Sequence, residues 1–242
     1  MSSSTPADPA AAATPELIWL RPERNARGPQ PTHSRAEIAA AAIALADAEG
    51  LSAVSMRKIA AALGAGTMSL YNYVPKKEHL FDLMLDAVAG EYELPPDPSG
   101  DPRADLTLLA EEALRVMRRH PWVPALVLAR PSIGPNSVRC VEFFLAAVAD
   151  AGLRPGTEME LFAVFNGSLC QYVEFERSSS VVVGTQWQAD LATFLTGMLA
   201  TGRFPHLAAA MMVAGASPPP DSAEMFARQV ERLITMVLTP MR

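Results

Sequence analysis

The most constraining feature of this sequence is a series of short helical patterns between residues 34 and 80. Apolar residues recur there at three- and four-residue steps, which is the period of an amphipathic helix and not of a strand. Ser34 is placed to cap the first helix, and Gly50, Gly64 and Pro75 end three successive helices. The pattern predicts two helices, a tight turn and a short third helix.

The rest of the chain continues the helical period, and no alternating run of useful length predicts a strand. A Pro-rich segment, residues 95–102, is the clearest boundary between domains. After it we expect a helix over residues 102–119 and a separate short helix that ends at 128. Further helices are expected over 138–148 and 157–177, from about 188, after 205 and over 221–238. Residues 178–186 are expected to form a loop, with a short β-like run as the alternative. The predicted fold class is all-α, with a small N-terminal domain joined to a larger helical domain.

Charge is unevenly distributed along the chain. The 242 residues carry a net charge of −6 and half of them are hydrophobic, so a packed core is expected. Residues 21–80 hold eight basic against five acidic side chains, which leaves −9 for the other residues. A basic N-terminal portion on an acidic body indicates that only this portion meets a polyanion.

The sequence gives little support for an enzyme. Cys140 and Cys170 lie in apolar runs without a CxxC pattern, which is typical of buried, reduced thiols. No glycine-rich phosphate loop and no Ser-His-Asp or Cys-His grouping is suggested, and the four histidines are scattered (His33, His79, His120 and His206). We therefore expect no catalytic residue, no metal ligand and no cofactor. No membrane span or signal peptide is expected either, so the predicted location is cytoplasmic.

The short third helix has an unusual composition for either a core or a surface helix. An inward face of Ile59, Leu63, Leu70 and Val74 would leave polar and aromatic side chains pointing outward, namely Thr67, Met68, Ser69, Tyr71, Asn72 and Tyr73. Hydroxyl, amide and methyl groups suit base edges in a major groove, and Tyr71, Tyr73 and Lys77 suit phosphates. Ser55 and Arg57, at the start of the preceding helix, are placed to hold a phosphate. Alternatively, the two tyrosines are half-buried packing residues.

Residues 49–84, EGLSAVSMRKIAAALGAGTMSLYNYVPKKEHLFDLM, closely resemble the DNA-binding domain of the TetR family of transcriptional regulators. By that resemblance, residues 34–80 are the helix-turn-helix domain and residues 81–242 bind a small molecule and form a homodimer. The resemblance also implies that ligand binding moves the connecting helix and releases double-stranded operator DNA. It places the usual DNA contacts at Ser55, Arg57, Thr67, Met68, Ser69, Tyr71, Asn72, Tyr73 and Lys77.

A finer resemblance extends outside that domain. The segments ELIWLRPE, RHPWVPAL at 119–126, GPNSVR at 134–139 and FNGSLCQYVE at 165–174 are similar to an actinobacterial branch that includes SimR, a repressor of an antibiotic efflux gene. This favours a repressor of an efflux or resistance gene, released from a palindromic operator by a small molecule. The metal site of tetracycline repressors is not expected here, because His120 lies in a different local setting.

The N-terminal extension, residues 1–33, is interpreted as a flexible segment that ends in an extended arm over 16–33. Three prolines interrupt the arm, and Arg21, Arg24 and Arg27 could lie in a minor groove beside the recognition helix. The alternative is a mobile, weakly basic tail.

The C-terminal domain is rich in aromatic residues, which are candidates to line a pocket for an aromatic or drug-like effector. The predicted ligand-binding residues are Trp122, Phe144, Phe162, Phe165, Asn166, Gln171, Tyr172 and Glu174. Most of these candidates are expected to be plain core, and only a minority to contact a ligand. The helices over 157–177 and 221–238 are the predicted dimer helices. Two alternatives to the repressor are a transcriptional activator and a regulator controlled by a protein partner, because both would use the same reader helix. An all-helical enzyme is a remote alternative.

Overall fold

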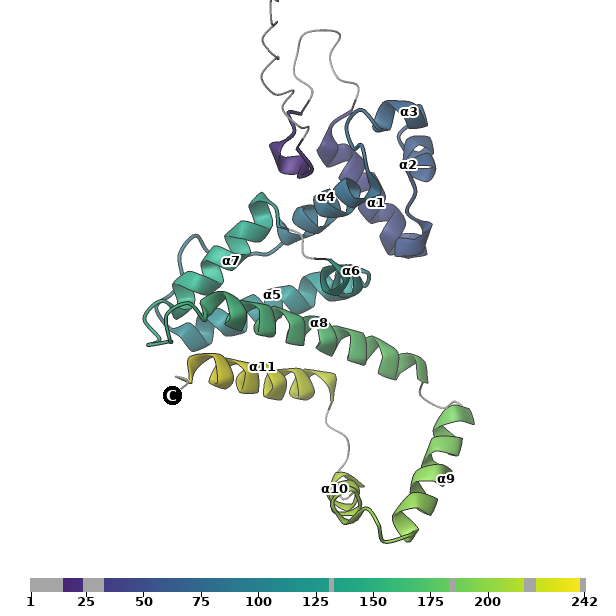
Figure 1. Cartoon of the computed structure of the whole chain (residues 1–242), viewed down its shortest axis with the longest axis vertical. Helices are drawn as coiled ribbons and strands as arrows, with labels where there is room; N and C mark the ends of the chain where they lie inside the picture. Colours follow the sequence, from purple (N-terminus) through teal and green to yellow (C-terminus); the bar gives the residue numbers. More distant parts are fainter. Residues whose placement is uncertain (1–14, 24–32, 131–132, 183–185, 216–220, 240–242) are drawn as a thin grey trace, which may run out of the picture. The chain divides into compact units, whose positions relative to one another are not determined.

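The computed structural model describes residues 15–23, 33–130, 133–182, 186–215 and 221–239, and its regular elements are all helical (Figure 1). No strand occurs among these residues, which confirms the predicted all-α class. The helices are η1 (Ile18–Leu20), α1 (Arg35–Glu49), η2 (Leu51–Ala53), α2 (Met56–Ala62), α3 (Thr67–Leu70), α4 (Lys77–Ala89), α5 (Pro102–Arg119), α6 (Val123–Ala129), α7 (Pro135–Val148), α8 (Glu158–Val182), α9 (Gln186–Ala200), α10 (Pro205–Gly215) and α11 (Ser222–Leu238).

The chain forms two compact units. The first contains residues 1–91 together with 131–138, and the second contains residues 92–130 and 139–242. The first unit therefore includes all of α4 and the first turn of α7, and it runs beyond residue 80, where the sequence pattern places the end of the helix-turn-helix domain.

In the first unit, α1 and α2 each begin at a side-chain cap. Ser34 and Glu37 make the predicted capping box at the start of α1, and the Ser55 hydroxyl accepts the backbone N–H of Lys58 at the start of α2. Gly64 has a φ of 63°, the left-handed conformation that a glycine adopts without strain in the tight turn before α3. Apolar side chains from these helices form one core, in which Ile38, Ile59, Leu70, Val74 and Leu80 are fully buried.

In the second unit, α5, α6, α8 and α11 pack together. The Asp101 carboxylate caps α5 by accepting the N–H groups of Arg103 and Ala104, and Pro102 occupies the first turn. Asp221 caps α11 in the same way through the N–H of Glu224. Both helices begin where the sequence predicts.

The structure corrects the predicted loop over residues 178–186. Helix α8 continues to Val182, and residues 183–185 lie outside the described part of the chain. No glycine or proline lies between Gly167 and Gly184, so nothing forces an end at residue 177. The Ser178 hydroxyl donates to the carbonyl of Glu174 at 2.7 Å, and so bonds along the helix instead of ending it. Serine and valine have low helix propensity, but this local preference is too weak to end α8 at residue 177.

The described part of the N-terminal extension also differs from the extended arm that the prolines suggest. Residues 18–20 form a single 3₁₀ turn, and Ile18 is fully buried. Residues 15–23 are thus part of the first unit, and the reason lies in contacts to α1 and α4 that are distant in sequence.

Helices α9 and α10 lie beside each other within the second unit and make few contacts with its other helices (Figure 1). They expose large apolar side chains, namely Trp187, Leu191, Phe194, Leu207, Met211 and Met212. None of the described helices combines the length and the apolar character that crossing a membrane would need.

Candidate DNA-binding surface and effector groove

Helix α3 and the turn that follows it expose one face and bury the other. Leu70 is fully buried, whereas Met68 is 78% exposed and Tyr71 is 41% exposed. Ser69 and Asn72 are exposed beside them, and Thr67 and Tyr73 are half-buried. The turn is held by backbone hydrogen bonds from Asn72 to Ser69 and from Tyr73 and Val74 to Leu70. The structure therefore places these side chains as the sequence pattern predicts, although their role as DNA contacts stays a prediction.

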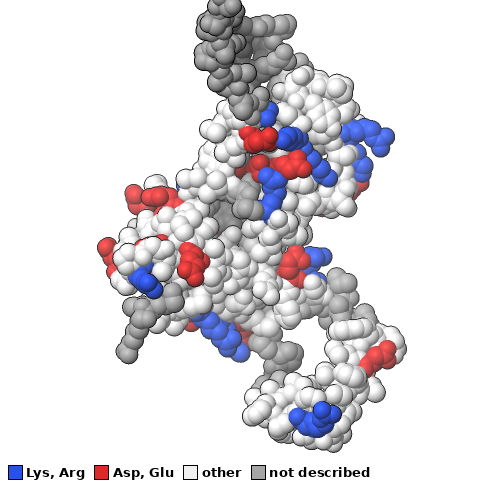
Figure 2. Space-filling model, in the orientation of Figure 1, with Lys and Arg blue, Asp and Glu red and all other residues white. Residues whose placement is uncertain are grey.

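The basic residues near this face differ in how they are engaged. Arg57 is exposed on α2, and Lys58 pairs with Glu49 at 2.6 Å. Lys77 lies over the ring of Phe81, with its Nζ 5.2 Å from the ring centroid. Figure 2 shows basic and acidic side chains interspersed on the first unit, so its positive charge is local and not a uniform field.

Of the three arm arginines, only Arg21 lies in the described part of the chain. Its Nε donates to the carbonyl of Pro15 at 2.5 Å, so the side chain folds back on its own segment. Arg24 and Arg27 lie outside the described residues. Minor-groove binding by this arm stays a prediction.

The predicted ligand-binding residues fall into two groups. Phe144 and Phe165 are buried and form an aromatic cluster with Phe162, with ring centroids 5.3 and 5.5 Å from that of Phe144. Trp122 is buried against His120. The remaining residues lie along α8: Asn166 is half-buried, Gln171 is exposed, Tyr172 donates to the carbonyl of Ser222 at 2.7 Å, and Glu174 pairs with Arg177 at 2.8 Å.

An open groove lies instead between α5 and α11. Its volume is about 720 Å³, within the usual range for small-molecule sites. Its lining residues are Thr107, Glu111, Leu114, Arg115, Arg118, Ala223, Phe226, Ala227, Val230 and Glu231. The ring of Tyr172, which is not itself part of the lining, packs against the ring of Phe226, with the ring centroids 5.3 Å apart. One predicted ligand residue thus lies next to the groove, and the aromatic cluster is not part of its lining.

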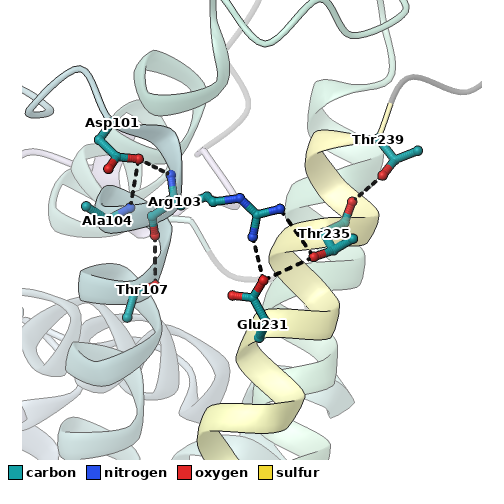
Figure 3. Close-up of polar contacts among 7 residues, drawn as sticks. All are labelled: Asp101, Arg103, Ala104, Thr107, Glu231, Thr235 and Thr239. Atoms are coloured by element: carbon teal, nitrogen blue, oxygen red, sulfur yellow. Dashed lines mark hydrogen bonds and ion pairs between the residues drawn. The ribbon is translucent and has the colours of Figure 1, made fainter.

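Charged pairs bound this groove. Arg103 of α5 donates to Glu231 of α11 at 2.6 Å and also to the Thr235 hydroxyl (Figure 3). Arg118 forms a two-pronged pair with Glu176, which lowers the pKa of that carboxyl mainly through the hydrogen bond itself. Among the described residues, Glu111 makes no ion pair. The groove therefore has an apolar floor, paired charges at its rim and one carboxylate, that of Glu111, without an ion pair among the described residues.

Sequence reasoning missed these groove residues for an identifiable reason. Phe226 and Val230 form an apolar stripe on α11, which was interpreted as a dimer face. The weaker signal was the charge pattern on α5, where Glu111, Arg115 and Arg118 recur at helical spacing. That pattern is typical of any solvated helix, so it does not by itself distinguish a groove.

An all-helical chain in which a tight turn presents a short, exposed polar helix belongs to the class of helix-turn-helix DNA-binding proteins. Comparison with known proteins defines the family. Residues 38–84 match the model described as bacterial regulatory proteins, tetR family, and residues 94–237 match the tetracyclin repressor-like C-terminal domain. The chain therefore belongs to the TetR family of transcriptional regulators, and it is not an enzyme.

Relatives in sequence and structure agree with this assignment. The chain is 39% identical over 205 residues to the HTH-type transcriptional repressor DrrR1 of Streptomyces coeruleorubidus, covering 81% of this chain and 76% of that protein. It is similar to apo ActR of Streptomyces coelicolor, with a TM-score of 0.71, 26% identity and coverage of 87% and 97% of the two chains. ActR in complex with actinorhodin matches with a TM-score of 0.68 and 25% identity, covering 85% and 97%. The finer SimR branch is not addressed by these matches and stays a prediction.

Proposed function

We propose that this protein is a homodimeric repressor that binds a palindromic operator of an efflux or resistance gene and is released by a small molecule. The observation that carries the DNA-binding part is the single exposed face of α3, where buried Leu70 fixes the helix and leaves Met68, Ser69, Tyr71 and Asn72 outside. Such a face has the size and chemistry of a major-groove reader. The description of DrrR1 as a repressor supports the sign of regulation.

The test of DNA binding is selection of bound sequences from a random DNA pool with purified full-length protein. A palindromic consensus is the expected result, and failure of a folded dimer to enrich any sequence would contradict the proposal. Met68→Ala should then weaken operator binding about 5-fold, the low end of the about 1–3 kcal/mol that a good bidentate base contact contributes, because Met68 offers only an apolar contact. Met212→Ala on α10 is the matched control, since Met212 is 72% exposed and lies outside the reader.

The dimer is expected to form through α8 and α11. These helices expose Val164, Phe175 and Met236 although both also contribute to the core. Phe175→Glu should shift the sedimentation coefficient toward that of a monomer. Leu128→Glu, on α6, is a control of similar exposure, because the two side chains are 60% and 57% exposed.

The effector is proposed to be an aromatic or drug-like molecule that binds in the groove between α5 and α11. The groove supports this because it is open, whereas the aromatic cluster around Phe144 is closely packed. Ala227→Trp would fill the groove without removing a core side chain, and Ala189→Trp on exposed α9 is its control. Actinorhodin, with which ActR was crystallised, is a first probe. Binding that survives Ala227→Trp unchanged would place the site elsewhere.

An activator, or a regulator controlled by a protein partner, is the second candidate function. It differs from the repressor only in the consequence of DNA binding. In vitro transcription from the selected operator, with and without the protein, separates the two, because a repressor lowers the amount of transcript.

A further inference from the structure

Residues 15–23, which we name the N-terminal brace, are held by contacts to three parts of the first unit. Ile18 is fully buried, although it lies outside the helix-turn-helix pattern. Leu20, two residues later on the same 3₁₀ turn, is 68% exposed. Because Ile18 is buried and Leu20 is exposed, the Ile18 side chain is the one that packs this short segment against the domain.

Arg35, in the first turn of α1, joins the brace to the end of the recognition helix. Its Nη1 donates to the carbonyls of Ile18 at 3.2 Å and Arg21 at 3.0 Å, and its Nε donates to the carbonyl of Tyr73 at 3.3 Å. The backbone N–H of Arg35 donates in turn to the Glu23 carboxylate at 2.9 Å. One planar guanidinium thus binds three carbonyls from two distant segments, a geometry that lysine cannot reproduce.

The brace also holds the start of α4. The Glu16 carboxylate pairs with Lys76 at 2.6 Å, and the Glu16 carbonyl lies 2.6 Å from Nε2 of buried His79. Tyr73 and Lys76 lie on either side of Pro75, in the connection between α3 and α4. The brace therefore fixes this connection at both ends, once through Arg35 and once through Glu16.

We propose that the N-terminal brace positions the connection between α3 and α4 for DNA reading, and that Arg35 is the positioning residue through which it acts. The connection carries Tyr71, Asn72 and Tyr73, and Lys77 follows it. Without the brace, the turn would keep its backbone bonds and the buried side chains of Leu70 and Val74, but it would lose the support that Arg35 and Glu16 give at Tyr73 and Lys76, and α3 itself has only a single turn. The part of the inference that concerns DNA rests on the proposed function above.

The first test uses the full-length protein alone and measures amide hydrogen exchange at Asn72, Tyr73 and Val74. Ile18→Ala and Arg35→Lys should each speed exchange at these amides about tenfold or more, because the turn opens locally more often. Leu20→Ala is the matched control and should leave them unchanged. Equal exchange in Ile18→Ala and Leu20→Ala, with both proteins folded, would overturn the proposal. Ile18→Val and Arg35→Lys keep the test valid if Ile18→Ala does not fold.

The second test measures affinity for the selected operator at a temperature where circular dichroism finds every variant fully folded. Arg35→Lys keeps the positive charge but loses the planar guanidinium that binds three carbonyls, so we expect its operator affinity to be about tenfold weaker than that of the wild type. Leu20→Ala should bind the operator as the wild type does. Faster exchange with unchanged affinity would overturn the role in DNA reading. If the wild type binds no DNA, the repressor function fails, and the exchange test still decides whether the brace holds the turn.

Discussion

Asp86 makes a strong prediction about stability, because its carboxylate caps a helix that begins fifty residues later in the sequence. It is 5% exposed near the end of α4. Its Oδ1 accepts the backbone N–H of Asn136 at 2.9 Å and of Ser137 at 3.0 Å, together with the Ser137 hydroxyl at 3.2 Å. The side-chain amide of Asn136 donates to its Oδ2 at 3.2 Å. All of these residues belong to the first unit.

Asp86→Ala should therefore destabilise the protein strongly. It removes an N-cap, which is worth about 0.5–2 kcal/mol, and it leaves buried N–H groups unpaired at about 1–3 kcal/mol each. Because the helix can partly rearrange, we expect a net loss of about 3 kcal/mol, equivalent to a fall in Tm of roughly 6–12 °C for a chain of this size. Asp86→Asn keeps one acceptor oxygen but loses the charge near the helix N-terminus, so we expect about 1 kcal/mol.

Thermal unfolding followed by circular dichroism at one fixed protein concentration measures this effect. Asp190→Ala is the control, because Asp190 is exposed on α9 and accepts one hydrogen bond, from Gln186 at 2.9 Å. Its loss should change the free energy of unfolding by less than about 0.5 kcal/mol. A Tm for Asp86→Ala that equals that of the control would refute the capping argument.

Three further predictions follow from the packing. Gly134→Ala should lower the free energy of unfolding by about 1–3 kcal/mol in urea titrations, because the added methyl would collide with the Asp86 carboxylate and the Trp19 ring; a neutral effect would contradict this. The hydrogen bond from Arg118 lowers the pKa of Glu176 in the folded state, so the pair stabilises the protein above the ordinary carboxyl pKa of 4.5 and loses this effect as the pH falls through the folded pKa. The Tm difference between wild type and Arg118→Ala should therefore shrink between pH 6 and about pH 3, and a constant difference would show that packing dominates. Burial raises the pKa of Cys170 to about 12, so its thiol should react with iodoacetamide at pH 8 only after unfolding, and rapid labelling of the native protein would contradict that burial.

Local signals were sufficient to predict most of the helices and the exposed face of α3. Helix α5 begins at Pro102 after its Asp101 cap, and Ser34 and Ser55 cap α1 and α2, as their sequence positions indicate. Each of these features depends on residues within one helical turn, and such features can be read from a single sequence. The exposed face of α3 follows in the same way, because burial of Leu70 fixes which side chains point outward.

The features that sequence reasoning missed depend on contacts between distant residues. Arg35 binds Tyr73 across 38 residues, and Arg103 pairs with Glu231 across 128 residues at the rim of the groove. Nothing in the local pattern around Ile18 distinguishes a buried anchor from an apolar residue on an extended arm. The end of α8 was misplaced because low helix propensity in a short run does not stop a helix whose other residues are packed.

The predicted effector residues illustrate that aromatic content alone does not distinguish a pocket from a core. Aromatic side chains bury large areas wherever they lie, so a cluster of them is as typical of a core as of a pocket. A ligand that entered between Phe144 and Phe165 would first have to separate rings that are already in contact, at a cost comparable to creating a cavity in the core. The groove on α5 and α11 needs no such separation, because Leu114, Phe226 and Val230 already form a floor that one ligand face could cover. Binding at the proposed groove site therefore requires no opening of the core, whereas binding in the aromatic cluster requires contacts that first offset that opening.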